Sequence, residues 1–311
     1  MMSVRHMTEA RSLICSGIYF GSRKSYLVQS AVFTITRHRR PRRWPAHAPR
    51  CTSNQDTSWP TACSGFCRRC GVYHSLPRTA HAEMHAQRLM EQLYQHKRLD
   101  FEVDIALAND AASTAKMYDP GPGHMFGVLV CSDVAGKEVV LRAFSGQHKG
   151  LWEVAGWVRP VGTLLNTCRE YQDAQREIMH QGQLFRDLKA GGEWHRAQQA
   201  RSKQRELSRS LHRRILQSYT LRNFNGETAS LQEAWASPSV KPPSGVGDCC
   251  APKLLNAAVA AGLRPLSMAE FWMGVPIQQS RLVRENGEMY SACEERCQPI
   301  LGFMLCGILP C

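Results

Sequence analysis

The sequence GVGDCCAPKLLNAAVAAGLRPLSMAEFWMG, residues 245–274, decides the fold of this chain. Cys249 and Cys250 open an apolar run in which leucine, alanine and valine recur at helical spacing. After that run, Pro265–Trp272 is short, apolar and aromatic, and Gly274 follows it closely. This pattern is typical of a buried β-strand. The stretch therefore predicts a helix that begins at a cysteine and leads directly into a buried strand.

A second cysteine-led helix is predicted after a short polar loop. It lies in GEMYSACEERCQPILGFMLCG, residues 287–307, where Cys293 and Cys297 precede another apolar run with helical spacing. Helix N-termini carry unsatisfied N–H groups and partial positive charge, which lower the pKa of a thiol and favour the thiolate. We therefore expect the thiolates of Cys249, Cys293 and Cys297 to converge on one tetrahedral Zn²⁺, at about 2.3 Å each.

The order of these segments resembles the zinc-dependent cytidine and nucleobase deaminase superfamily. The resemblance is carried by Cys249, by the Pro252–Leu255 run behind it, and by the pair Cys293 and Cys297. It implies an α/β fold, a deaminase-like α/β/α sandwich, with Zn²⁺ as the cofactor. The sequence departs from the family in two ways. Ala251 stands where the family places its proton-shuttling glutamate, and three residues separate the cysteine pair where two are usual.

A closer resemblance covers most of residues 80–309. The pieces MFGVLV, LRAFSG, GLWEVAGWV, GDCCAPKLL, PLSMAEFW and CEERCQPILGFMLCG look like the N-terminal extension of certain RluA-type RNA pseudouridine synthases. The resemblance implies a setting in RNA modification, with RNA and a pseudouridine synthase domain or subunit as partners, and no synthase active site in this chain. With Ala251 in place of the glutamate, the leading hypothesis is a zinc-binding accessory module that does not deaminate on its own.

Two alternatives remain open from the sequence. An active zinc-dependent deaminase would need another acid in place of the missing one, and the nearest candidates are Glu270 on the predicted strand and Glu294 and Glu295 beside the second cysteine pair. The triplet His81-Ala82-Glu83 also spells the deaminase motif H-A-E, but no cysteine pair follows it one strand later. In the other alternative, a structural or interaction protein without metal, the cysteines are buried apolar residues.

The N-terminal segment, residues 1–79, is interpreted as a basic, unstructured targeting or lead-in segment. The first 80 residues contain 13 of the chain's 39 lysines and arginines but only two acidic residues. This composition resembles a transit peptide to a mitochondrion or plastid, and a basic arm that binds nucleic acid is the rival interpretation. Cys63, Cys67, Cys70 and His74 have roughly metal-like spacing, but their polar setting favours free thiols in a flexible segment.

Residues 80–163 are predicted to form the first helix and a β-hairpin of the deaminase-like domain. Ala80–Leu99 is rich in strong helix formers. Phe126–Ser132 and Glu138–Ser145 are β-branched runs on either side of a glycine-containing turn, which favours a hairpin. Gly150–Val158 is expected to continue as a third extended segment.

An inserted helical arm is predicted over residues 164–236, broken at Gly191-Gly192, before the zinc-ligand core at residues 237–311. Within the arm, one set of arginines and one set of mainly apolar residues each recur every four residues, so that each set forms a stripe along a helix. The apolar stripe is expected to pack against the body. The arginine stripe is a candidate for tracking RNA phosphates, and a solvated helical arm explains it as well. The arginines are Arg201, Arg205, Arg209 and Arg213.

Cysteine usage and hydropathy limit the setting of the protein. The 13 cysteines have irregular spacing and no secretory signal pattern accompanies them, which favours an intracellular, reducing compartment and metal ligation over a disulfide framework. No apolar run reaches the ~18 residues that a membrane span requires, so we expect no membrane partner. The net charge of +13 belongs mainly to the N-terminal segment.

Overall fold

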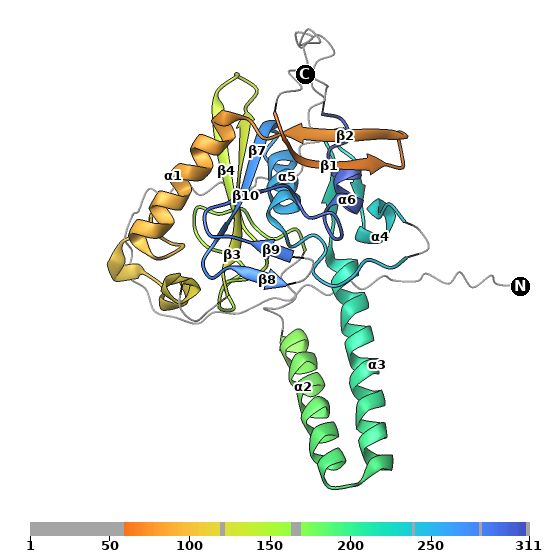
Figure 1. Ribbon diagram of the computed structural model, residues 1–311. Coiled ribbons are helices and arrows are strands. Elements are labelled where there is room, and N and C mark those ends of the chain that lie inside the picture. The colour runs from red at the N-terminus through yellow and green to blue at the C-terminus, as the bar shows by residue number, and fades with distance from the viewer. Residues whose placement is uncertain (1–58, 119–121, 163–168, 238–239, 280–281, 309–311) are drawn as a thin grey trace, which may run out of the picture. The chain divides into compact units, whose positions relative to one another are not determined.

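The computed structural model describes residues 59–118, 122–162, 169–237, 240–279 and 282–308 (Figure 1). The helices are α1 (Ala80–His96), α2 (Arg169–Ala190), α3 (Trp194–Ser218), α4 (Leu231–Ala234), α5 (Cys250–Ala260) and α6 (Gln298–Met304). The strands are β1 (Thr61–Cys67), β2 (Val72–Pro77), β3 (His124–Ser132), β4 (Glu138–Phe144), β5 (Leu221–Arg222), β6 (Thr228–Ala229), β7 (Arg264–Met273), β8 (Ile277–Gln279), β9 (Leu282–Arg284) and β10 (Met289–Tyr290). Among the described residues, no helix has the length and hydropathy needed to cross a bilayer.

A sheet with the strand order β10-β7-β3-β4 lies between helices on both of its faces (Figure 1). Its neighbouring strands pair antiparallel. Side chains of β3 alternate between the faces, as the pleat requires. Phe126, Val128 and Val130 share one buried cluster with α1, whereas Leu129 and Cys131 share another with α5 and α6. The predicted mixed helix-and-sheet class is therefore confirmed.

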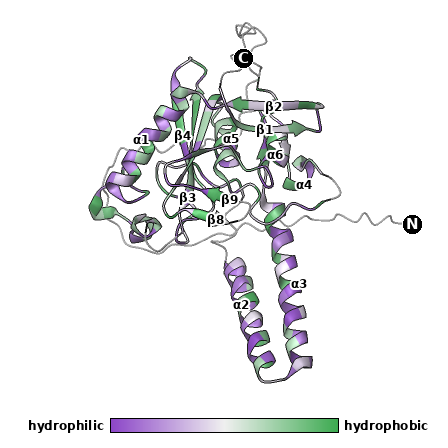
Figure 2. Ribbon diagram, in the orientation of Figure 1, coloured by the Kyte–Doolittle hydropathy of each residue, from purple (hydrophilic) through white to green (hydrophobic). Residues whose placement is uncertain are grey.

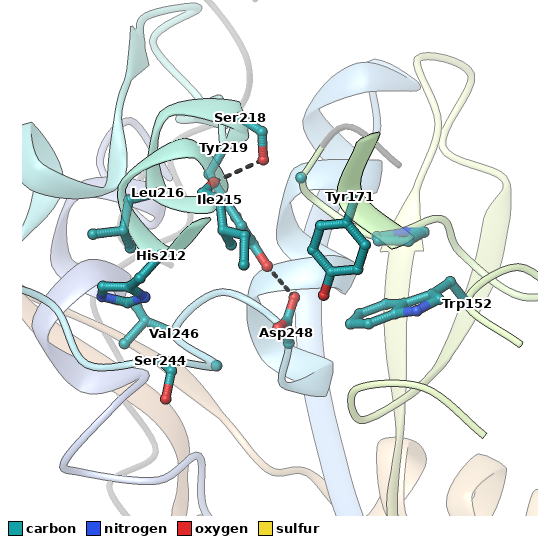
Figure 3. A pocket seen from close by; sticks show the side chains of 13 residues that line it. Trp152, Tyr171, His212, Ile215, Leu216, Ser218, Tyr219, Ser244, Val246 and Asp248 are labelled. Carbon is teal, nitrogen blue, oxygen red and sulfur yellow. Dashed lines mark hydrogen bonds between the residues drawn. The ribbon is translucent and has the colours of Figure 1, made fainter. Parts of the chain in front are cut away.

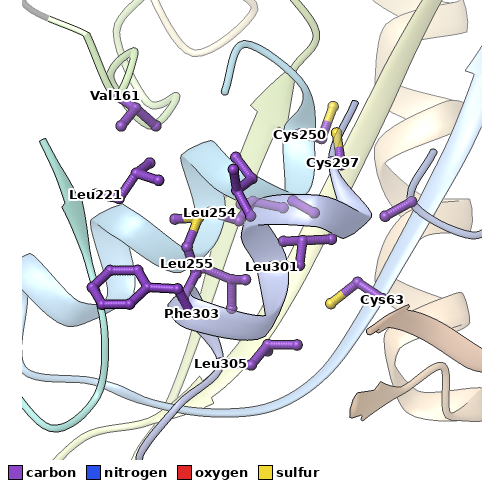
Figure 4. Packing of buried hydrophobic residues seen from close by; sticks show 14 of the residues in the cluster. Cys63, Val161, Leu221, Cys250, Leu254, Leu255, Cys297, Leu301, Phe303 and Leu305 are labelled. Atoms are coloured by element: carbon purple, nitrogen blue, oxygen red, sulfur yellow. The ribbon is translucent and has the colours of Figure 1, made fainter. Parts of the chain in front are cut away.

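The elements predicted around the cysteines are also present. The strand expected at Pro265–Trp272 is β7, which is buried along most of its length. The predicted hairpin is β3 with β4, and the helix predicted from Ala80 is α1, capped by the Thr79 hydroxyl. Figure 4 shows α5 and α6 packed together through Leu254, Leu255 and Leu301, so that the two cysteine-led helices share one apolar core.

Helices α2 and α3 form the predicted helical hairpin, with the break at Gly191-Gly192. Gly192 has a φ of +77°, a conformation that glycine adopts without strain. Figure 2 shows that both helices are largely hydrophilic. Leu211 on α3 is buried and Leu207 and Ile215 are half-buried, so the apolar stripe is the side of α3 that packs, as predicted.

Two expectations from the sequence are wrong. Part of the segment expected to be unstructured up to residue 79 forms the antiparallel pair β1 and β2, and Ala62, Cys63 and Leu76 of that pair are buried in the core cluster of α5 and α6. This pair was not predicted because the segment is polar and rich in cysteine. Only β1 has buried side chains along one face, and β2 is mostly exposed. Gly150–Val158 is not a strand but a loop, anchored by the Trp157 indole N–H, which donates to the Leu99 carbonyl at 2.8 Å. Residues 1–58, the remainder of the predicted targeting segment, lie outside the described residues.

Candidate metal centre

The two cysteine-led helices bring three thiols together at one end of the core. Cys249 is the N-cap of α5, and Cys297 is the N-cap of α6. The Cys293 carbonyl accepts hydrogen bonds from the N–H groups of Cys297 and Gln298, at 3.2 and 3.0 Å, in a turn that leads into α6. The three sulfur atoms all lie within 4.8 Å of one another, and the Cys293 and Cys297 sulfurs are 3.4 Å apart. The structure therefore brings together all three predicted ligands.

This donor set fits a zinc ion. A tetrahedral site with Zn–S distances of about 2.3 Å separates its sulfurs by roughly 3.8 Å, close to the spacing in the cluster. Cys297 is buried, whereas Cys249 and Cys293 are half-buried, so one side of the cluster is accessible. Three protein ligands leave one tetrahedral position open, which is the arrangement of catalytic rather than structural zinc sites.

Hydrogen bonds among the three thiols shift their pKa values in opposite directions. Hydrogen bonds to the sulfur of Cys293 from Cys249 and Cys297, and from nearby backbone N–H groups, lower the pKa of Cys293 to about 2. Donation of those hydrogen bonds raises the pKa of Cys249 and of Cys297, and their burial raises it further. These hydrogen bonds favour the thiolate form of Cys293, which is the form that binds a metal ion.

Glu270 places a buried carboxyl group at the start of α5, beside this centre. It lies on β7, is only 4% exposed, and accepts a hydrogen bond from the Ala251 N–H at the start of α5. Its Oε1 has no hydrogen-bond partner among the described residues. Burial, reinforced by the negative charge of Cys293, raises the pKa of Glu270 to about 8. A buried carboxyl that is protonated at neutral pH and retains a free oxygen is suited to carrying a proton.

Gly127 makes room for this arrangement. It is the β3 residue that pairs with Glu270, and a Cβ at this position would lie 3.0 Å from the Cys250 Cβ and 3.2 Å from the Glu270 Cγ. Only a residue without a side chain lets the start of α5 approach the sheet so closely.

The other candidate acids are not part of the centre. Glu294 and Glu295 are exposed to solvent beside Cys293. Cys250 points into the sheet, with its thiol 3.4 Å from the Met125 carbonyl, and is a packing residue. Asp248, just ahead of α5, is hydrogen-bonded by the Tyr219 hydroxyl, and the N-cap of α5 is Cys249.

Sequence reasoning missed the buried lysine next to this centre. Lys253 is 1% exposed, and its ammonium donates to the carbonyl oxygens of Phe144 and Gly146 at 2.9 and 2.7 Å. It also lies over the Phe144 ring, 4.9 Å from the centroid. Burial lowers the pKa of Lys253, while nearby Asp248 favours its charged form. The sequence signal for a buried lysine was its position within an otherwise apolar helical run.

A cavity of about 110 Å³ begins one residue before Cys249 (Figure 3). Trp152 and Tyr171 lie on one side of it, with His212 and Leu216 on the other, and Asp248 and Tyr219 form a hydrogen bond between them. Burial raises the pKa of Asp248 and that of Tyr219. The three clustered cysteines do not line this cavity.

The remaining sequence candidates lie elsewhere. His81 of the H-A-E triplet is on α1, which packs on the other face of the sheet, and its ring is hydrogen-bonded to Glu138 at 2.6 Å. On α3, the side chains of Arg205, Arg209 and Arg213 are exposed. Arg201 differs, because its guanidinium lies over the Phe185 ring of α2 at 5.3 Å.

The interpretation of the centre rests on the residues of this chain, without support from a known relative. Comparison with models of protein families, with curated proteins and with solved structures finds no match to the chain.

Proposed function

We propose that this chain carries a zinc-dependent, deaminase-like centre that removes the amino group of a nucleobase by hydrolysis. The observation that carries the proposal is the convergence of the Cys249, Cys293 and Cys297 thiols, with the buried carboxyl of Glu270 hydrogen-bonded to the start of the α5 helix beside them. Zinc held by the three thiolates would supply a Lewis acid that activates water for attack on an amine-bearing ring carbon. A deaminase-like α/β/α sandwich accounts for a sheet with helices on both faces and cysteines at two helix starts.

Glu270 takes the role that the deaminase pattern assigns to a helix glutamate. In that pattern the acid lies two residues after the first ligand, which is the position of Ala251 here. The Ala251 N–H donates a hydrogen bond to the Glu270 carboxylate. Glu270, from β7, would therefore replace the glutamate that α5 lacks at residue 251. In its deprotonated form, Glu270 would accept a proton on the free Oε1 from the attacking water and return it to the leaving amine.

Aromatic side chains near the centre support a base as the substrate. Trp152 and Tyr171 line the cavity that begins beside Cys249, and aromatic rings bind unpaired bases by stacking, at roughly 1–3 kcal/mol per base. The exposed arginines of α3 offer contacts to phosphates. Together with the resemblance to extensions of pseudouridine synthases, these features favour a base in single-stranded RNA over a free nucleoside.

The test measures ammonia release and zinc content of the full chain, purified without added metal. Cytidine, adenosine and short single-stranded RNA containing either base are the substrates. We expect Glu270→Gln to retain the zinc content of the wild type and to lose ammonia release by about 10²–10⁴-fold. Glu294→Gln, which removes an exposed carboxyl beside Cys293, is the matched control and should leave both unchanged. Equal activity of Glu270→Gln and wild type would refute the assignment of Glu270.

A second candidate function is a zinc-binding accessory module of RNA modification that does not deaminate. Ala251 favours it, because the acid usual in active deaminases is absent from α5. In this case the zinc is structural, and RNA or a pseudouridine synthase subunit is the partner. Zinc bound through Cys249, with no ammonia released from any of these substrates, would favour this module over the enzyme. A Cys293→Ser variant with unchanged zinc content and stability would contradict both candidates.

A further inference from the structure

We propose that Cys67, Cys70, His74 and Cys306 form a structural zinc site that is separate from the metal centre and joins the β1–β2 hairpin to the end of α6. One donor atom from each of the four residues lies within 4.8 Å of the other three. The Cys70 sulfur is 3.1 Å from the His74 Nε2 and 3.6 Å from the Cys306 sulfur. These separations suit a single ion with Zn–S distances of about 2.3 Å and a Zn–N distance of about 2.0 Å.

The hairpin supplies three of the four donors. Cys67 ends β1, Cys70 lies in the turn, and His74 is on β2, so the spacing is Cys-x2-Cys-x3-His. The turn is closed by the Gly71 N–H, which donates to the Cys67 carbonyl at 2.9 Å. Closely spaced cysteines and a histidine on a tight turn are typical of structural zinc sites. Cys63 on the same strand is not part of the group, and its side chain is buried in the core cluster of α5 and α6.

Cys306 closes the site from a distant part of the chain. It lies just after α6, and a donor 236 residues away from Cys70 in sequence comes close only because α6 packs directly on β1. Gly65 and Gly302 permit this packing, since a Cβ on either glycine would lie within 2.5 Å of the backbone of the other element. The Asn225 side-chain N–H also points at the Cys306 sulfur, at 3.5 Å, and would support a thiolate there.

The composition of the group indicates a structural role. Three thiols and one imidazole fill all four positions of a tetrahedral ion, so none remains for water or substrate. Cys67 and Cys306 are buried, His74 is half-buried, and only Cys70 is exposed. A two-stranded hairpin is marginally stable alone, and a shared ion would fix it to the core.

The test counts zinc per chain by elemental analysis of the full chain, purified without added metal. Three remaining donors can retain zinc, so the test uses the double variant Cys70→Ser/His74→Asn. We expect it to hold one zinc ion fewer than the wild type. Cys63→Ser, on the same hairpin but outside the group, is the control and should hold as much zinc as the wild type. A double variant with the zinc content of the wild type would overturn the proposal.

Cys249→Ser distinguishes this site from the metal centre. If both sites bind, the wild type holds two zinc ions, and each variant loses a different one. If only the hairpin site binds, the wild type holds one ion that Cys249→Ser retains and the double variant loses. One ion that is lost in Cys249→Ser and retained in the double variant would overturn the hairpin site while leaving the metal centre intact.

Thermal unfolding and peptide mapping complete the test. Excess chelator should lower the Tm of Cys249→Ser, and should lower the Tm of Cys249→Ser/Cys70→Ser/His74→Asn much less. Cys70 and Cys306 also lie close enough for a small movement to form a disulfide. A zinc-free wild type with a Cys70–Cys306 disulfide in its peptide map would overturn the proposal in favour of a redox link.

Discussion

At the scale of single residues, Lys253 shows how a charge is accommodated inside this core. A buried ammonium costs several kcal/mol unless its hydrogen bonds are satisfied. Here two carbonyl oxygens accept from Lys253, and the Phe144 ring lies beneath it. The lysine therefore ties α5 to the end of β4, next to the residues that position Cys249.

Replacing Lys253 tests how much its hydrogen bonds to the end of β4 stabilise the protein. We expect Lys253→Met, which keeps the length of the side chain, to lower the free energy of unfolding by about 1–3 kcal/mol, because two inward carbonyls lose their donor. Urea denaturation monitored by circular dichroism measures it. Lys241→Met, at an exposed lysine, should change stability by less than about 0.5 kcal/mol. Similar stability in the two variants would mean that water replaces the ammonium.

At the scale of elements, the approach of α6 to β1 depends on two glycines. Glycine in a helix is normally about 1 kcal/mol less favourable than alanine, so Gly302 weakens α6 in isolation. A Cβ at Gly302 would lie 2.2 Å from the Phe66 carbonyl carbon. Packing thus overrides helix propensity at this position.

At position 302, glycine should give a more stable protein than alanine, which is the reverse of their usual order in helices. Gly302→Ala is expected to destabilise the protein by about 1–3 kcal/mol, because α6 must move away from β1. Gly191→Ala is the control, since the nearest atoms to its Cβ would be 3.6 and 3.7 Å away. Thermal unfolding of both variants measures the difference, and a stabilised Gly302→Ala would contradict the close packing.

The exposed arginines of α3 carry the prediction about RNA. Arg205, Arg209 and Arg213 take part in none of the ion pairs between described residues, whereas Arg176 and Arg196 of the same hairpin pair with Asp173 and Glu193. Cations without an acidic partner are free to contact phosphates.

Changing these arginines to glutamine should weaken RNA binding. For the triple variant Arg205/Arg209/Arg213→Gln, the slope of log K against log[salt] should fall by about 2, at about 0.7 per lost phosphate contact on a single strand. Fluorescence anisotropy with single-stranded RNA at several salt concentrations measures it. The control changes Arg176, Arg186 and Arg196 to glutamine. An equal loss in the control would indicate attraction by net charge alone.

At the scale of the whole molecule, half-buried His124 and buried His148 make folding sensitive to acid. Burial, together with the charges of neighbouring His148 and Lys253, lowers the pKa of His124 to about 4. The pKa of His148 is lowered as well, mainly by burial. The two rings lie 5.2 Å apart. Between pH 6.5 and 4 the unfolded chain therefore binds more protons than the folded one, and stability falls as the pH falls.

The pH dependence should be traceable to His124. Over this range the free energy of unfolding of the wild type should decrease with falling pH, by at most about 1.4 kcal/mol per pH unit for each histidine. His124→Gln should show a shallower decrease. His180→Gln, at an exposed histidine of α2, should follow the wild type. Urea denaturation at pH 7, 6, 5 and 4.5 measures the slopes, and parallel curves for all three proteins would contradict the assignment.

Much of the sheet and of the helices was predictable because their signals are local. Strong helix formers predict α1, β-branched runs around a glycine-containing turn predict β3 and β4, and paired glycines predict the break between α2 and α3. The β1–β2 hairpin was not predictable, because its short strands lie in a basic, polar segment and pack against α6, a distant part of the chain. The loop at Gly150–Val158 looked extended because its apolar residues pack as single anchors, such as Trp157, without strand pairing.

Which cysteines begin the two helices can be read from neighbouring residues, because a cysteine followed by an apolar helical run lies at a helix N-terminus. Which acid lies beside these cysteines depends on tertiary packing. Glu270 is 19 residues beyond Ala251 and reaches the centre because β7 pairs with β3 beneath α5. The tertiary structure likewise brought Cys306 to the hairpin cysteines, through the glycine contact between α6 and β1. Helix starts are encoded by neighbouring residues, whereas the meeting of distant side chains depends on how the core packs.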